Sequence, residues 1–361
     1  MKFPQIEGMN PFLNQAKIFW HWDRLCSFLK HKRTFPIQVE LNPTNRCNMN
    51  CDYCITKYAH KKEDIKIEAL KDFLKQFSKL GGKSIDWTGG GEPMIYSNIG
   101  EALEYASSKS IRQGIMTNGL FKPELLNIIA KNTDWVRFSL DTTIHSNFSR
   151  MKHLPEKSLD RILSNIEKLS NYSNGPRVVA NMNLGKWNAS NLFETAKKVK
   201  ELGADGFQIR PILPVESQIL TPDEVELFEY WLPRIETLKE LEDSNFQIFI
   251  SRDKFTDVIN NKLYKREYDK CQYHYFVIVL NANGDVCVCT HHLNDKKFTF
   301  GNIYKNSLRE IWESEQRLKV IEHCNKELDF SKCQVCCKGD QLNKILYFIQ
   351  NPDSDSNPDF F

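Results

Sequence analysis

The chain has 361 residues, 41% of them hydrophobic, so it can bury a large core, and we expect one large domain with a smaller appendage. Its 49 Lys and Arg nearly balance its 46 Asp and Glu, and a net charge of +3 gives no reason to expect nucleic acid or an anionic membrane as a partner. Neither a signal peptide nor a membrane-spanning run is recognisable, so we expect a cytoplasmic protein whose eleven cysteines serve metal binding or catalysis rather than disulfides.

Residues 1–35 carry aromatic and basic residues at roughly helical spacing, which predicts a helical N-terminal extension. Over residues 36–245, short apolar runs then alternate six times with amphipathic segments. The predicted strands are 37–41, 84–87, 111–116, 135–140, 177–183 and 206–210, and the predicted helices are 65–80, 97–109, 122–132, 157–171, 190–202 and 222–242. Such alternation predicts a parallel sheet, either open and doubly wound or an incomplete barrel, with its chemistry at the C-terminal strand ends.

The alternation stops near residue 245. Asn283-Gly284 separates two apolar runs, 277–280 and 286–289, which predicts a β-hairpin. We expect residues 246–350 to form a small, cysteine-rich second domain. Residues 351–361 are rich in Asp, Ser, Asn and Pro and predict a mobile tail.

A first group of cysteines, Cys47, Cys51 and Cys54, lies in a loop directly after the first predicted strand. Three thiolates can hold a four-iron cluster and leave one iron open, whereas structural zinc or iron-sulfur sites usually take four protein ligands. The open iron can bind a substrate or cofactor through nitrogen and oxygen atoms. On spacing alone, a zinc site completed by His60 remains the alternative.

This loop resembles the Cys-x3-Cys-x-aromatic-Cys hallmark of the radical S-adenosylmethionine (SAM) superfamily, with Tyr53 as the aromatic residue. The run Gly89-Gly90-Gly91-Glu92-Pro93 after the second strand resembles the glycine-rich stretch of that superfamily, which meets the amino group of SAM. Glycines let the backbone approach a ligand closely, and Glu92 offers a carboxylate to an ammonium. The resemblance covers residues 36–245 and implies a partial (β/α)6 TIM-like barrel that binds a [4Fe-4S] cluster and SAM.

The same resemblance implies further roles in cofactor and substrate binding. Tyr53 would cover the adenine, and Arg210 would meet the SAM carboxylate or act on the substrate. Other residues would line the SAM site: Gly89, Gly90, Gly91, Glu92, Asn118, Ser139 and Asp141. The expected substrate-pocket residues are Asn183, Trp187, Arg210 and His274. Each of these could equally be a turn former, a packing residue or a solvated charge.

A second group of cysteines is formed by Cys271, Cys289, Cys333 and Cys336, from the hairpin region and a later turn. It resembles the twitch domain, the shortened relative of the SPASM domain, and implies one auxiliary [4Fe-4S] cluster, because only Cys337 follows where a full SPASM domain has more cysteines. A four-cysteine zinc ribbon is the alternative. Cys337 could replace its neighbour Cys336 as a ligand. The cysteines without an assigned role are Cys26, Cys287, Cys324 and Cys337.

The resemblance implies that SAM is cleaved reductively to a 5′-deoxyadenosyl radical, with electrons from a donor such as flavodoxin or ferredoxin. We expect the radical to abstract hydrogen from a small polar metabolite, giving oxidation, or giving epimerisation if Cys287 or another spare thiol returns a hydrogen. Radical modification or crosslinking of a peptide is the alternative, although residues 1–35 contain no evident strand-rich module for a leader peptide. A further alternative is a non-catalytic electron carrier, but in such a protein the glycine-rich stretch would have no function.

Overall fold

The computed structural model describes residues 15–213, 221–260, 266–330, 333 and 337–351. Within these ranges one sheet has the strand order β10-β9-β8-β1-β2-β3-β4-β5-β6-β7. Strands β1 to β7 are parallel, β8 runs parallel to β1, and β9 and β10 are antiparallel. The strands are β1 (Gln38–Leu41), β2 (Ser84–Trp87), β3 (Arg112–Thr117), β4 (Trp135–Ser139), β5 (Arg177–Leu184), β6 (Gly206–Pro211), β7 (Gln247–Ile250), β8 (Val277–Leu280), β9 (Asp285–Cys287) and β10 (Thr299–Asn302).

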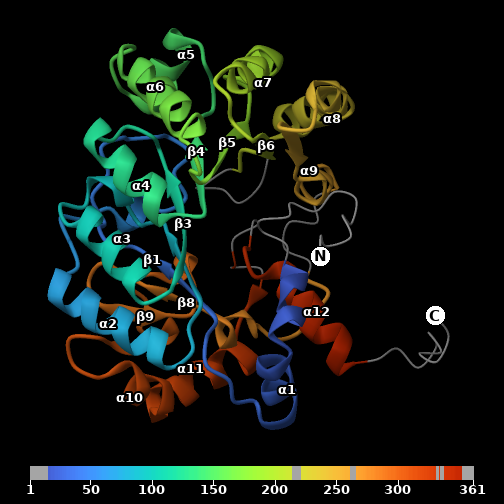
Figure 1. Cartoon of the computed structure of the whole chain (residues 1–361). Coiled ribbons are helices and arrows are strands. Elements are labelled where there is room, and N and C mark those ends of the chain that lie inside the picture. The colour runs from blue at the N-terminus through green and yellow to red at the C-terminus, as the bar shows by residue number, and fades with distance from the viewer. Residues whose placement is uncertain (1–14, 214–220, 261–265, 331–332, 334–336, 352–361) are drawn as a thin grey trace.

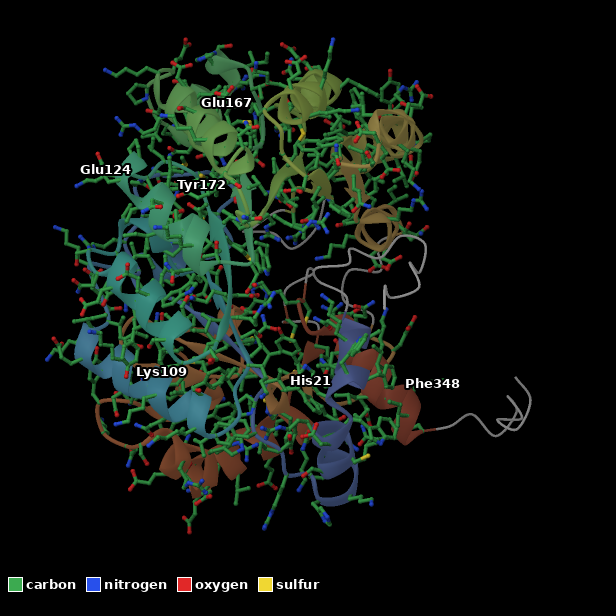
Figure 2. The ribbon with its side chains drawn as sticks, in the orientation of Figure 1. His21, Lys109, Glu124, Glu167, Tyr172 and Phe348 are labelled. Atoms are coloured by element: carbon green, nitrogen blue, oxygen red, sulfur yellow. The ribbon has the colours of Figure 1, made fainter. Side chains whose placement is uncertain are left out.

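The helices that connect the parallel strands cover one side of the sheet, as Figure 1 shows. They are α2 (Ile67–Lys79), α3 (Ile99–Ser108), α4 (Leu126–Asn132), α5 (His145–Lys152), α6 (Ser158–Ser170), α7 (Leu192–Glu201), α8 (Pro222–Glu236) and α9 (Arg252–Ile259). Glu124, just before α4, points away from the strands at the outer edge of this layer (Figure 2). The predicted α/β class with a partial barrel and a C-terminal hairpin is confirmed. The sequence pattern missed β7, α5 and α9, and the expected end of the alternation near residue 245 is wrong, because β7 pairs with β6 in parallel and α9 follows it.

The two faces of the sheet differ in chemistry because side chains alternate along each strand. Val39, Ile85, Ile115, Val136 and Phe207 face the helices and belong to the main hydrophobic core. The opposite face, called the inner face below, carries polar residues at the alternate positions: Glu40, Asp86, Arg137, Asn181, Gln208 and Arg210. A parallel sheet usually buries apolar residues on both faces, so this inner face points to a binding function.

The C-terminal segment extends the same sheet, since β8 pairs with β1 and Gly284 turns the hairpin with a φ of +87°. Its helices are α10 (Leu308–Glu313), α11 (Glu315–Lys326) and α12 (Asp340–Gln350). The N-terminal helix α1 (Trp22–His31) lies beside α12 (Figure 1), and a small core joins them through Leu25, Phe28 and Leu346. The expected tail and the first fourteen residues lie outside the described ranges. None of the described helices is long and apolar enough to cross a bilayer.

Gly114 on β3 generates a stability prediction. A Cβ atom there would lie 2.0 Å from Cε2 of Trp135, whose ring lies across the inner face. We expect Gly114→Ala to destabilise the protein by about 1–3 kcal/mol, because the indole must move from its packed position. In the matched variant Gly100→Ala, the new atom would lie 3.1 Å from the flexible Ile128 side chain, and we expect a change within about 1 kcal/mol. Chemical denaturation measures both, and equal stabilities would contradict this account of Gly114.

Candidate functional site

The loop between β1 and α2 gathers the first group of cysteines. Cys47, Cys51 and Cys54 are each partly buried, and the Cys54 amide donates a hydrogen bond to the Cys51 carbonyl at 3.3 Å. Burial raises the pKa of Cys47 to about 12, and the negative charges of Glu92, Cys51 and Cys54 add to the rise. The three sulfurs are therefore close enough to affect one another. Burial and mutual repulsion favour the neutral thiols of Cys47 and Cys51, so both become thiolates when a positively charged metal compensates them.

His60 lies beside this group, with its Nε2 atom 3.8 Å from the Cys54 sulfur. Burial raises the pKa of Cys54, but hydrogen bonds from His60 and Thr56 outweigh that effect and lower it overall. Among the described residues, no three His, Cys, Asp or Glu side chains converge closely enough to hold a single metal ion. A four-iron cluster does not require such convergence, since each thiolate binds a different iron. The three cysteines thus fit a cluster with one open iron.

The glycine-rich stretch after β2 packs directly against the cysteine loop. A Cβ atom at Gly91 would lie 1.9 Å from the Arg46 carbonyl oxygen, and one at Gly90 would lie 2.4 Å from the Asn45 Oδ1 atom. The Glu92 amide donates to the same Arg46 carbonyl at 2.8 Å. Any larger residue at Gly91 would push the two loops apart. The glycines therefore serve the packing of the chain on itself, whatever ligand they also meet.

Glu92 is buried and hydrogen-bonded to its own chain. Its Oε1 atom accepts from the Thr117 hydroxyl at 2.6 Å and the Met94 amide at 3.0 Å, and its Oε2 atom accepts from the Asn118 amide at 2.7 Å. Burial raises the pKa of Glu92 to about 7, although these hydrogen bonds oppose the rise. The structure thus brings together Glu92, Asn118 and the cysteine loop, where the Asn118 side chain donates to Asn48 at 2.7 Å.

Tyr53 and Asp141 both hydrogen-bond to Lys152, a residue that the sequence analysis missed. Lys152, at the end of α5, places its Nζ atom 2.5 Å from both the Asp141 Oδ2 atom and the Tyr53 hydroxyl, which itself donates to Asp141 at 2.5 Å. The Lys152 and Asp141 side chains are 4% and 0% exposed, so this is a fully buried ion pair. Burial raises the pKa of Cys51, and the Lys152 ammonium, which hydrogen-bonds to this thiol, opposes the rise. A positive charge thus lies beside one of the three sulfurs.

The remaining predicted residues of the first site are spread over neighbouring strands. Ser139 is partly buried at the end of β4, and Arg210 extends from β6 on the inner face. The Asn183 amide donates to the Asp141 Oδ1 atom at 2.7 Å. Trp187 is partly buried in the loop after β5, with the Lys186 ammonium 5.0 Å from its ring centroid. His274 is fully buried and stacks on Tyr275, so it belongs to the packing of the C-terminal segment.

The second group of cysteines lines one cavity in the C-terminal segment. Four of the lining residues are cysteines: Cys271, Cys289, Cys333 and Cys337. Burial raises the pKa of Cys289, and Cys271, Cys337 and Cys333 add to the rise, so these four sulfurs also lie close together. Cys336 lies outside the described residues. Of the two neighbouring cysteines considered as the fourth ligand, Cys337 is the one that the structure describes in the cavity.

Two other cysteines of this segment are buried outside the cavity, although Cys324 lies close to the second group: its carbonyl accepts a hydrogen bond from the Cys271 amide at 3.5 Å, and its charge adds to the rise in the pKa of Cys271. Cys287 is fully buried beside Ala59, Val279 and Leu293, and its sulfur lies 3.8 Å from the Thr299 hydroxyl. Cys324 lies in the main hydrophobic core. Neither is among the residues that line the cavity.

The two groups of cysteines are linked through Thr290, which follows Cys289 in the chain. The Thr290 carbonyl accepts a hydrogen bond from Tyr58 of the first loop at 2.9 Å, and its hydroxyl donates to Glu40 on the inner face at 2.7 Å. Glu40 also accepts hydrogen bonds from Lys338 at 2.9 Å and Tyr273 at 3.2 Å. Glu40 itself lines the cavity of the second group. The inner face therefore adjoins both sites.

The α/β sheet carries one group of three cysteines, which lacks a fourth cysteine ligand, and a second group of four. This arrangement is typical of proteins that hold two iron-sulfur clusters. Comparison with known families specifies it further. The model of the radical SAM superfamily matches residues 41–217, and the model of SPASM, an iron-sulfur cluster-binding domain, matches residues 271–338. The chain belongs to the radical SAM superfamily and carries a C-terminal SPASM-like domain, which implies a SAM-binding [4Fe-4S] cluster and an auxiliary cluster.

The names of similar proteins describe different roles. The chain is 24% identical to the tungsten-containing aldehyde ferredoxin oxidoreductase cofactor-modifying protein of Pyrococcus furiosus, over 87% of this chain and 90% of that protein. It is 26% identical to the antilisterial bacteriocin subtilosin biosynthesis protein AlbA of Bacillus subtilis, over 88% and 70%. The crystal structure of Streptococcus suis SuiB bound to S-adenosylmethionine matches with a TM-score of 0.64 and 18% identity, over 86% of this chain and 73% of SuiB.

Lys152 generates a prediction for the first cluster. A positive charge beside a thiolate ligand stabilises the more negative, reduced state, so its removal lowers the reduction potential. We expect Lys152→Met to lower the midpoint potential of the first cluster by about 60 mV, a tenfold change for one electron. The control Lys157→Met removes the charge of an exposed lysine at the start of α6. Potentiometric titration followed by electron paramagnetic resonance measures the midpoint potential of both variants. Equal potentials in iron-loaded Lys152→Met and Lys157→Met would contradict the role of Lys152.

Cys337 generates a prediction for the second cluster. We expect Cys337→Ser to lose the iron and sulfide of one cluster after anaerobic reconstitution, because the cavity then offers one thiolate fewer. The matched variant Cys287→Ser changes a buried cysteine outside the cavity and keeps the iron content of the wild type. Full iron content in Cys337→Ser, together with loss in Cys336→Ser, would assign the ligand to Cys336 instead.

Proposed function

We propose that this protein is a radical SAM oxidoreductase that removes two electrons and two hydrogens from a small polar metabolite held on the inner face of the sheet. The observation that carries the proposal is the position of Thr290, which joins the first cysteine loop, the inner face and the cavity of the second group of cysteines. A substrate on the inner face would lie between a site that takes a hydrogen atom and a site that takes an electron.

In this proposal Cys47, Cys51 and Cys54 hold the first cluster, and Cys271, Cys289, Cys333 and Cys337 hold the second, with Cys336 as the alternative fourth ligand. Tyr53, Asn118, Ser139 and the 89–92 stretch surround SAM. When bound, the first cluster and SAM supply the 5′-deoxyadenosyl radical, and the second cluster supplies an acceptor for the electron of the substrate radical.

The side chains of the protein bind the substrate and receive its proton. Loss of a hydrogen atom leaves a substrate radical, and its further oxidation releases one electron and one proton. Burial raises the pKa of Asp86 to about 7, with Glu40 adding to the rise, so the Asp86 carboxylate can accept a proton at neutral pH. The polar inner face would orient the substrate, and the surrounding core would exclude water from the radical.

Epimerisation needs a thiol that returns a hydrogen atom, and Cys287 is the predicted donor. Burial raises the pKa of Cys287 to about 12, which keeps it in the thiol form that such a step requires. Its neighbours Ala59, Val279 and Leu293, however, are apolar, and the Thr299 hydroxyl is the polar contact that the structure records for its sulfur. The arrangement therefore supports oxidation better than epimerisation.

Peptide modification is the second candidate function, and the comparisons favour it. AlbA is described as a bacteriocin biosynthesis protein, and one SuiB structure, which matches this chain with a TM-score of 0.61, contains the precursor peptide SuiA. An electron donor such as flavodoxin or ferredoxin would serve either function.

Release of 5′-deoxyadenosine from SAM under dithionite tests the proposal. We expect the anaerobically reconstituted wild type to release it and Cys51→Ser to release none, because the first cluster then lacks a ligand. Cys26→Ser, which alters a cysteine on α1, serves as the control and keeps the activity. An electron carrier would release none in any variant. The choice of a small metabolite is wrong if productive turnover of SAM starts only when a peptide is added.

A further inference from the structure

The inner face contains buried polar atoms without partners, which lie on three strands and in the loop after β1. Within the described part of the chain, no hydrogen-bond partner exists for the Nε atoms of Arg137 and Arg210, for both amide atoms of Asn42, or for the Oδ1 and Oε1 atoms of Asn181 and Gln208. Folded proteins leave few buried polar atoms unpaired, since each costs about 1–3 kcal/mol. Their concentration on one face indicates a ligand that completes their hydrogen bonds.

The charges on this face are divided unevenly between its two sides. On the β1 side, Glu40 is paired with Lys338 at 2.9 Å. On the β4 to β6 side, neither Arg137 nor Arg210 forms an ion pair with any carboxylate that the structure describes. The one hydrogen bond of the Arg137 guanidinium that the structure records goes to the Met116 sulfur, at 3.1 Å. The β4 to β6 side therefore presents two positive charges without an ion-paired carboxylate among the described residues, although Asp86 and Glu40 lie near enough to Arg137 to affect its pKa.

The two guanidinium groups also act on each other. Burial and then the nearby charge of Arg210 lower the pKa of Arg137 to about 10, against the opposing effect of Asp86 and Glu40. Arg137 and Arg210 are both partly buried, and two like charges placed close together repel each other unless an anion lies between them. A guanidinium offers two parallel N–H groups that match the two oxygens of a carboxylate.

We propose that Arg137 and Arg210 form a subsite that binds a carboxylate of the substrate, so that the metabolite oxidised by this protein is a carboxylic acid. This inference rests on the proposed function, since it assumes that the substrate occupies the inner face. Arg137 lies two residues before Ser139, the last residue of β4. The bound carboxylate would therefore lie farther from the C-terminal edge of the sheet than the strand ends. The neutral side-chain amides of Asn181 and Gln208 then face the rest of the substrate.

Glutarate, a simple dicarboxylate, is the probe for this subsite. The full-length protein is reconstituted with both clusters, saturated with SAM and titrated with glutarate by isothermal titration calorimetry. We expect binding to the wild type, affinity weakened about tenfold or more in Arg137→Gln and Arg210→Gln, and intermediate loss in Arg137→Lys, which keeps the charge but not the paired N–H groups. Arg112→Gln removes the same charge from an arginine with a 77% exposed side chain and serves as the control with unchanged affinity.

Two further ligands test whether the subsite recognises a carboxylate rather than an amide or a phosphate. Glutaramide, which lacks the charges, should bind much more weakly than glutarate, and inorganic phosphate should not compete better than glutarate. The inference is overturned if the wild type binds no glutarate, if glutaramide or phosphate binds better, or if Arg137→Gln weakens SAM binding and leaves glutarate binding intact. Release of 5′-deoxyadenosine by these variants without added substrate would preserve the proposed radical function even where the subsite fails.

Discussion

Close packing of the loop after β2 against the cysteine loop after β1 is the constraint on which the rest of the structure depends. Gly91 allows the Arg46 carbonyl to approach, and the Glu92 amide then binds that same carbonyl at 2.8 Å. This contact holds the three cysteines over the C-terminal ends of the strands, where parallel α/β sheets place their chemistry. From there the inner face leads to the second group of cysteines, so that one face of the sheet adjoins both groups.

The alternation of side chains along the strands separates stability from function. Residues such as Val39, Ile85 and Phe207 pack against the helices and bury the apolar area that stabilises the fold. Their neighbours on the inner face, such as Asn181 and Arg137, are polar and incompletely hydrogen-bonded, which destabilises the protein without a ligand. A ligand that pairs these groups recovers that free energy on binding, as expected for a preorganised site.

The sequence predicted most strands and helices and both groups of cysteines because periodicity and cysteine spacing are local signals. It missed Lys152, since its partners Asp141 and Tyr53 are 11 and 99 residues away and only the fold brings them together. A lysine at the apolar end of an amphipathic helix was the one available signal, because Phe148 and Met151 of α5 are buried beside it. Arg137 escaped notice for a similar reason: as an internal strand residue it showed no motif, and only the register placed it beside Asp86.

Electron paramagnetic resonance of the reduced protein, recorded before and after addition of SAM, tests the central claim most directly. In the proposed site the three cysteines of the first loop leave one iron open, so SAM should bind that iron and alter the signal of the first cluster. In Cys337→Ser, where the second cluster is compromised, the same alteration should persist. A reduced first cluster whose signal is identical with and without SAM would contradict the account.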